Sequence, residues 1–203
     1  EKTYSRAKGY GVSYARISIG CSDFSSHVYS LCDEQGPASD PLQHFAFTTD
    51  ETDYVIPVLR EVLAINPDLR VIAAPWTAPR WMKYDTTSWN GSYLNTAHYQ
   101  DYADYFVRFI NQMKESGVSI YAVCPQNEPL NSNNCAGMLM PWWDEADFVK
   151  VLAPTFKQNG LKTKIYVWDH NYNYDNQSDE EDYPIHAYDR IGNVEGSELV
   201  VGA

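Results

Sequence analysis

Five short apolar runs, each one separated from the next by a polar loop and a segment with helical periodicity, constrain the fold of this chain most strongly. The runs are Tyr14–Ile19, Arg70–Ala74, Val118–Cys124, Lys164–Trp168 and Glu198–Gly202. Each run is mostly apolar without strict alternation, which is typical of parallel strands buried on both faces. Strand–helix alternation with no stretch of strands alone predicts a parallel α/β architecture.

Segments between these runs have the three- and four-residue periodicity of helices with one apolar face. We expect Thr96 to cap the clearest of them and Gly117 to end it. A second helix is predicted over residues 53–65, where Pro57 fits only the first turn, and a third over 144–158. A further short helix is predicted within 175–187. The apolar face of the second helix comprises Val55, Val58, Leu59, Val62 and Leu63.

The spacing between the predicted strands points to a barrel. It is roughly 35 to 55 residues, which is generous for a doubly wound sheet, and the excess lies in the loops after the strands. Those loops hold the active site of a (β/α)₈ barrel. Five strands cannot close eight, and such barrels rarely fit within about 200 residues. We therefore expect residues 1–203 to be one fragment of a single catalytic barrel, an incomplete (β/α)₈ barrel of about five parallel strands with intervening helices.

Composition and missing motifs exclude several functions. Fifteen Lys and Arg against 27 Asp and Glu give a net charge of −12, which opposes binding of nucleic acid through a basic face. No apolar stretch approaches the roughly 20 residues of a membrane span. The sequence has no GxGxxG after a strand, no GxxxxGK[ST], no GxSxG, no HExxH and no CxxC. We therefore expect no cofactor and no metal.

The most informative segment is the end of the third run, where a buried strand leads directly into Asn127-Glu128-Pro129. Pro129 ends strand pairing, which places Glu128 at the carboxyl end of the strand. A carboxylic acid at the mouth of an apolar barrel loses hydration, which favours the protonated form that a general acid needs. The adjacent amide can hydrogen-bond a sugar hydroxyl. The alternative interpretation is a solvated loop glutamate after a capping asparagine.

Three other loops are predicted to reach the same rim. Asp23 follows the first run and can accept hydrogen bonds from neighbouring hydroxyls, or it can be a turn residue. Trp76 and Trp81 lie in a proline-flanked loop after the second run, where indoles can stack on sugars or pack in the core. Asp169 and Asn171 follow the fourth run, where an ordinary strand-to-helix turn is the alternative.

The motifs CSDFS, PWTAPRWMK, QNEP and WDHN, in this order and spacing, resemble glycoside hydrolase family 30, the glucosylceramidase-like group that includes β-1,6-glucanases. The resemblance covers about residues 9–171. It implies a retaining β-glycosidase that hydrolyses β-glucosidic bonds by double displacement on a (β/α)₈ barrel. By the same resemblance, residues 1–203 correspond approximately to strands 2 to the start of 6.

The resemblance also implies roles for individual residues. Glu128 matches the general acid/base, and Asn127 is its amide neighbour. Asp23 and Trp76 match residues that hold the sugar at the scissile bond, and Asp169 and Asn171 border the substrate. The family's nucleophile follows a later strand, so we expect it outside this chain and expect the excerpt alone to be inactive.

Two other functions remain open at this stage. One is a non-catalytic carbohydrate-binding barrel that has lost a carboxylate, and the other is a different barrel hydrolase such as a xylanase or cellulase. The expected partners are a β-glucan or β-glucoside and the remainder of the parent chain, with membrane contact only for a glycolipid substrate. The loop 130–143, with two adjacent tryptophans, is predicted to build outer subsites. We expect the parent protein to be secreted, periplasmic or at the cell surface.

Overall fold

Five parallel strands form one sheet in the computed structural model, which describes residues 1–134, 136–171 and 182–203. The strands follow one another in the sheet in chain order. Their bounds are β1 Tyr14–Ser18, β2 Arg70–Ala74, β3 Ile120–Val123, β4 Lys164–Tyr166 and β5 Val200–Gly202. The fifth strand is shorter than predicted, because Ser197–Leu199 forms a turn of 3-10 helix instead.

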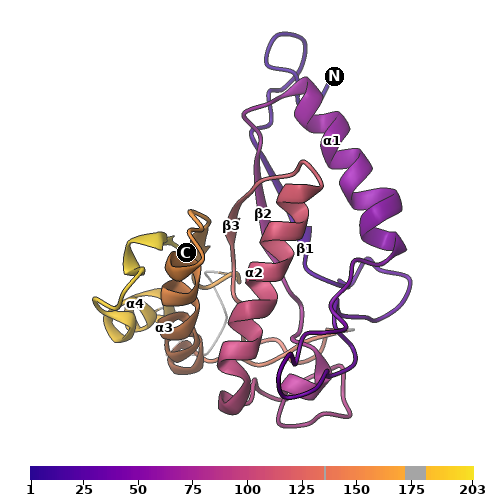
Figure 1. Ribbon diagram of the computed structural model, residues 1–203. Coiled ribbons are helices and arrows are strands. Elements are labelled where there is room, and N and C mark those ends of the chain that lie inside the picture. Colours follow the sequence, from indigo (N-terminus) through magenta and orange to yellow (C-terminus); the bar gives the residue numbers. More distant parts are fainter. Residues whose placement is uncertain (135, 172–181) are drawn as a thin grey trace.

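The sequential strand order confirms the barrel-type winding. A doubly wound sheet reverses its strand order at a switch point, whereas each strand here pairs in parallel with the next one in the chain. In Figure 1 the helices appear in chain order across the picture, beside the strands, and the long loops after β1, β2 and β3 gather at the lower end. The sheet is not closed, as expected for an incomplete barrel of five strands.

The sequence predicted that β1 is buried on both faces, but in the structure only one face of β1 packs against the core. Ala15 and Ile17 pack against the core, whereas Tyr14 and Arg16 line a cavity of about 310 Å³ on the other face of the sheet. Alternate residues of a strand point to opposite faces, so the polar side chains of β1 share the face that would be the inside of a barrel.

The α-helix predicted over residues 53–65 begins later than expected. Asp50–Val55 is a turn of π-helix, and α1 spans Ile56–Ile65 with Pro57 in its first turn, as expected. Leu59 and Val62 are buried, but Val58 is 59% exposed. The prediction for Val58 was wrong because the buried face of α1 is centred on Ile56, Leu59 and Val62, and Val58 lies outside it.

The second helix, α2 (Tyr99–Glu115), carries the aromatic core that packs between helices and sheet. The predicted cap at Thr96 was wrong. Asn95 takes that role, because its side chain accepts the N–H of Ala97 and caps a 3-10 turn that precedes the helix. Gly117 ends the helix as predicted: its φ is +81°, and the Val118 N–H reaches back to the Met113 carbonyl.

The third helix, α3, spans Trp142–Gln158, so both tryptophans of the predicted outer-subsite loop are the first residues of this helix. Trp142 packs against His186 of α4, which spans Tyr183–Ile191. The short helix predicted within 175–187 is therefore confirmed only from Tyr183 onward, since 175–181 lie outside the described residues. Among the described helices, none combines the length and apolar character needed to cross a membrane.

Candidate active site

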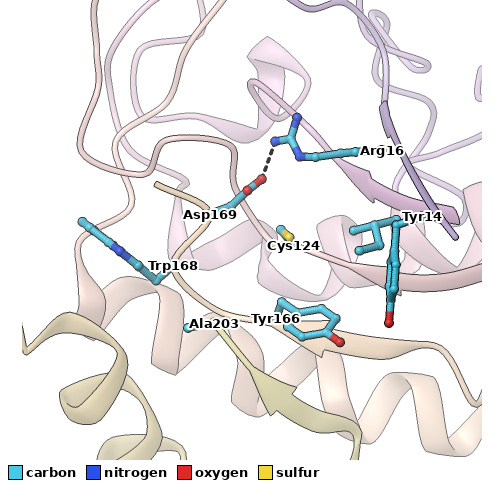
Figure 2. A pocket seen from close by; sticks show the side chains of 8 residues that line it. Tyr14, Arg16, Cys124, Tyr166, Trp168, Asp169 and Ala203 are labelled. Atoms are coloured by element: carbon cyan, nitrogen blue, oxygen red, sulfur yellow. Dashed lines mark hydrogen bonds and ion pairs between the residues drawn. The ribbon is translucent and has the colours of Figure 1, made fainter. Parts of the chain in front are cut away.

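One side chain from β1 and three from the segments that follow β2, β3 and β4 meet toward the carboxyl edge of the sheet. The Arg16 guanidinium of β1 donates to Asn127 Oδ1 at 2.8 Å and forms an ion pair with Asp169. The same guanidinium lies over the Trp76 ring, 4.9 Å from its centroid. Figure 2 shows Arg16 and Asp169 pointing toward each other above Cys124 in the cavity. Three of the predicted site residues, Trp76, Asn127 and Asp169, thus share one partner.

Arg16 is a site residue that the sequence reasoning missed. A signal was present, because an arginine in the middle of a run predicted to be buried on both faces requires a carboxylate or a similar partner. The chain did not show which carboxylate that partner is. Asp169 lies 153 positions away, and only the parallel pairing of the strands brings the two together.

The backbone of Asn127 and Glu128 is fixed between its two neighbouring strands. The Asn127 N–H donates to the Pro75 carbonyl after β2 at 2.8 Å, and the Glu128 N–H donates to the Asp169 carbonyl after β4 at 2.9 Å. Glu128 has a φ of +42°, in the left-handed region that a residue with a side chain rarely adopts. Such residues persist where the surrounding structure holds them, often at functional sites.

The Glu128 carboxylate lies in a polar environment. It is half-buried, and its Oε2 accepts hydrogen bonds from the side-chain amides of Asn131 at 2.7 Å and Asn134 at 2.8 Å. The apolar mouth expected from the sequence is therefore wrong at this oxygen, because the loop after β3 folds back and places two amide groups on it.

A buried acid supports the loop after β4. Glu145 of α3 is fully buried, and its Oε2 accepts the N–H of Trp168 at 3.3 Å. Burial raises the pKa of the Glu145 carboxyl to about 8, although the hydrogen bond from the Trp168 N–H lowers it. Trp168 has a φ of +60°. The protonated acid thus holds a strained residue that directly precedes Asp169.

Asn171 lies apart from this cluster. It is exposed, and its N–H donates to Nδ1 of His170 at 2.8 Å. The His170 ring stacks on Trp168 with a centroid distance of 5.1 Å, and burial lowers the pKa of His170. The structure therefore joins Asp169 to the other site residues but leaves Asn171 at the outer edge of the loop.

Asp23 lies at the tip of the loop after β1. The turn is held by two bonds of 3.0 Å: the Ser22 N–H donates to the Ser25 hydroxyl, and the Ser25 N–H donates to the Ser22 carbonyl. Asp23 itself is exposed, and within the part of the chain that the structure describes its carboxylate has no side-chain hydrogen bond or ion pair. The structure does not bring it into contact with Arg16 or Asn127.

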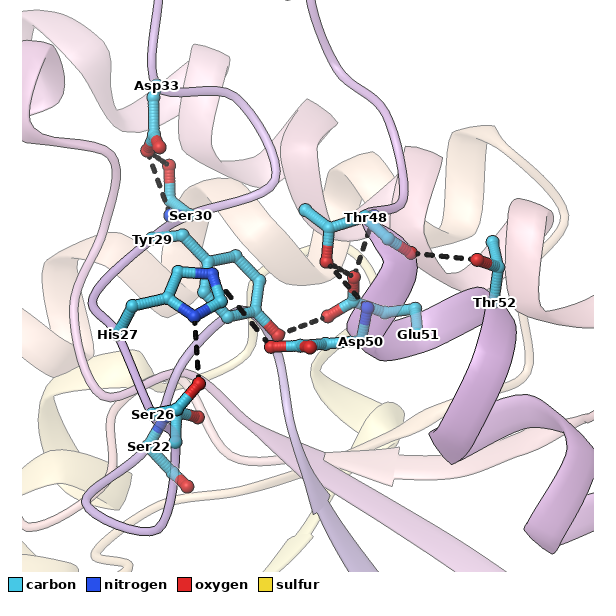
Figure 3. A network of polar contacts seen from close by, with 11 residues as sticks. Ser22, Ser26, His27, Tyr29, Ser30, Asp33, Thr48, Asp50, Glu51 and Thr52 are labelled. Carbon is cyan, nitrogen blue, oxygen red and sulfur yellow. Dashed lines mark hydrogen bonds and ion pairs between the residues drawn. The ribbon is translucent and has the colours of Figure 1, made fainter.

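The base of that same loop is rigid. Glu51 accepts the Tyr29 hydroxyl at 2.7 Å and the hydroxyl and N–H of Thr48 at 2.6 and 2.8 Å (Figure 3). Burial, assisted by the Glu51 carboxylate, raises the pKa of Tyr29 well above its ordinary value. Trp81 also braces this loop, since its indole N–H donates to the Cys32 carbonyl at 2.9 Å. Trp81 is thus a packing residue, as one alternative allowed.

The loops after β2 and β3 are joined by a buried lysine. Lys83 is 1% exposed, and its Nζ donates to the carbonyls of Ser88, Trp89 and Gly137 at 3.1 to 3.3 Å. Burial lowers the pKa of Lys83 to about 8, although Asp85 raises it. No group of three His, Cys, Asp or Glu side chains in the described ranges is placed to hold a metal ion.

Parallel strands wound in sequence, with charged and amide side chains at their carboxyl ends, define a (β/α)-barrel enzyme domain. A family model described as "Glycosyl hydrolase family 30 TIM-barrel domain" matches residues 1–177. The chain belongs to glycosyl hydrolase family 30.

Individual relatives agree with this family. The endo-1,6-beta-D-glucanase BGN16.3 of Trichoderma harzianum is 33% identical over 193 residues, covering 87% of this chain and 38% of that protein. The lysosomal acid glucosylceramidase of Mus musculus is 28% identical over 133 residues, covering 63% of this chain and 25% of its own length. The solved structure of the endo-beta1,6-glucanase BT3312 is 48% identical with a TM-score of 0.89, covering 100% of this chain and 45% of that one. This chain thus spans less than half of each of these relatives.

Proposed function

We propose that the protein is a retaining β-glycosidase in which Glu128 is the general acid/base. The observation that carries the proposal is the placement of Asn127-Glu128 at the end of β3, bonded to the strand ends on both sides and adjacent to the Arg16–Asp169 pair. Active sites of (β/α)₈ barrels lie at this end of the strands.

The proposed reaction has two displacements. In the first, a carboxylate attacks the anomeric carbon, the glycosidic bond breaks, and Glu128 gives its proton to the departing oxygen. In the second, Glu128 takes a proton from water, the water oxygen bonds to the anomeric carbon, and the carboxylate leaves. Two inversions retain the β configuration.

The cluster around Arg16 provides sugar contacts in this proposal. Arg16 binds the oxygen of the Asn127 amide, so the NH₂ end of that amide is the one that donates to a sugar hydroxyl. Trp76 is 8% exposed, with Arg16 over its ring, which makes it a wall of the sugar site rather than an open stacking platform. Asp23, Asp169 and Asn171 complete the proposed set from the surrounding loops.

The substrate class follows from relatives rather than from geometry. Those named above are 1,6-β-glucanases and a glucosylceramidase, so we propose a β-1,6-linked glucan or another β-glucoside as substrate.

The nucleophilic carboxylate is proposed to lie outside residues 1–203. Asp169 is paired with Arg16, and Glu198 is exposed and paired with Lys157 at 3.3 Å. A retaining enzyme needs two carboxyl groups about 5–5.5 Å apart. By this proposal the remainder of the parent chain supplies the second group, and residues 1–203 alone are inactive.

The test replaces the proposed acid in the full-length protein by Glu128→Gln. We expect most activity to be lost on β-glucosides with poor leaving groups and much less on activated aryl β-glucosides, because only the former need protonation. Azide should restore turnover and give a β-glycosyl azide. Equal losses on both substrates without azide rescue would refute the role. If the unmodified full-length protein binds the sugar but does not turn it over, the result would support a non-catalytic binding barrel.

A further inference from the structure

The loop after β3 contains a pair of amides whose geometry has a consequence for proton transfer. We propose that Asn131 and Asn134 are positioning residues that hold Oε2 of Glu128 and so assign the transferable proton to Oε1. The inference deepens the proposed function, since it rests on Glu128 acting as the acid/base.

Both amides donate to the same carboxylate oxygen. The Nδ2 atoms of Asn131 and Asn134 lie 2.7 and 2.8 Å from Oε2 of Glu128. A carboxylate oxygen that accepts two N–H donors has its lone pairs engaged, so a proton on that oxygen would displace a donor. Oε1 is therefore the oxygen that can take up and release a proton without breaking either contact.

The orientation of the Asn131 amide is fixed at its other end. Its Oδ1 accepts the backbone N–H of Asn133 at 2.9 Å. An amide has one acceptor and one donor end, so this contact requires the NH₂ group to face Glu128. Asn131 can thus present only a donor to Oε2.

The backbone between the acid and its amides is closed by a tight turn. The Asn131 N–H donates to the Glu128 carbonyl at 2.8 Å, and the Glu128 N–H donates to the Asp169 carbonyl at 2.9 Å. Together with the positive φ of Glu128, these bonds fix the backbone from which the Glu128 side chain extends toward the amides.

The loop that carries the amides is itself anchored. Gly137 packs closely beneath it, because a Cβ at this position would lie 3.3 Å from the Asn131 carbonyl oxygen. The Gly137 N–H donates to the Trp89 carbonyl at 3.0 Å, and the Gly137 carbonyl accepts Nζ of Lys83 at 3.3 Å. The two amides are therefore held by buried contacts from the loop after β2.

The acid/base must be protonated in the first displacement and ionised in the second. With Oε2 held by two donors, Glu128 changes protonation at Oε1 while its carboxyl plane stays fixed. Preorganised donors of this kind avoid reorganisation during the reaction.

The test compares Asn131→Ala, Asn134→Ala and the double variant with Asn133→Ala in the full-length protein. Asn133 is an exposed neighbour in the same loop, and its backbone N–H remains in the alanine variant. We expect each of the first two changes to lower kcat/KM on a poor leaving group about tenfold or more, with a smaller effect on an activated aryl glucoside and little change in KM. The alkaline limb of the kcat/KM profile should move to higher pH, because the carboxylate loses its donors.

A nearly isosteric variant keeps the test valid if the alanine variants do not fold. Asn131→Asp places a second carboxyl beside Oε2, and the repulsion between like charges should move the alkaline limb further to higher pH. Leaving-group dependence and pH profiles equal to those of Asn133→Ala would overturn the inference while the Glu128→Gln result still stood. A Glu128→Gln variant with normal activity would instead overturn the proposed function itself.

Discussion

The buried acid Glu145 gives the protein a pH-dependent stability that one substitution should remove. Burial raises the pKa of its carboxyl from an ordinary value of 4.5 to about 8 in the fold. Between these two values the folded chain holds a proton that the unfolded chain has released. The free energy of unfolding therefore falls as pH rises from 4.5 to 8, and this contribution is present in full only below 4.5.

The magnitude follows from the size of the shift. At pH 7 the pH is 2.5 units above the pKa of the carboxyl in the unfolded chain, whereas the folded chain still holds the proton. Each pH unit in this range lowers the free energy of unfolding by about 1.36 kcal/mol. Glu145→Gln keeps an oxygen for the Trp168 N–H but cannot ionise. Relative to the unmodified protein, it should gain up to about 3 kcal/mol of stability between pH 4.5 and pH 7.

The assay is urea unfolding of the full-length protein and its Glu145→Gln variant at pH 5, 7 and 9, followed by tryptophan fluorescence. Glu198→Gln is the matched control, because Glu198 is exposed and its pKa is lowered by its own N–H and by Lys157. Infrared difference spectra should show a protonated carboxylic acid at pH 7 that is missing in Glu145→Gln. Stability curves of the two proteins that stay parallel from pH 5 to pH 9 would refute the reasoning.

Three further substitutions test the site and its supports. Lys83→Met should leave the carbonyls of Ser88 and Gly137 without this donor and the Trp89 carbonyl with only the Gly137 N–H, which should lower stability by about 2 kcal/mol or more, with faster amide exchange in residues 85–92 and 136–140. Because the pKa of Lys83 is lowered to about 8, the unmodified protein should gain stability from pH 8 to 10.5 and the variant should not. Arg16→Met removes the one nitrogen, Nη2, that contacts both Asn127 and Asp169, so kcat/KM should fall about tenfold or more at an unchanged circular dichroism spectrum, and near-normal kinetics would contradict a site role. Asp23→Ala should lower kcat/KM about tenfold or more if this exposed carboxylate binds sugar, whereas a normal value would make it a turn residue.

Local pattern was sufficient to predict the strands and most helices. The apolar runs predict strands because their residues are buried, and Pro57 and Gly117 predict helix ends through backbone conformation. The positions of Asn127 and Asp169 at strand ends follow from where the apolar runs stop. One error arose where a short-range alternative competed, because Asn95 caps the turn in place of Thr96. Another arose at α1, where the buried face is centred on Ile56, Leu59 and Val62 and leaves Val58 exposed.

The sequence by itself determined that parallel strands alternate with helices and that Glu128, Trp76 and Asp169 follow strand ends, because these features depend on neighbours within a few residues. Only the tertiary structure decided which polar groups meet. Arg16 bonds Asn127 and Asp169 across 111 and 153 positions, Lys83 joins two loops, and Glu145 is buried beneath Trp168. Such contacts form only when strand pairing brings distant strand ends together. The desolvation that shifts the pKa values of Lys83 and Glu145 likewise exists only after the loops and helices have packed.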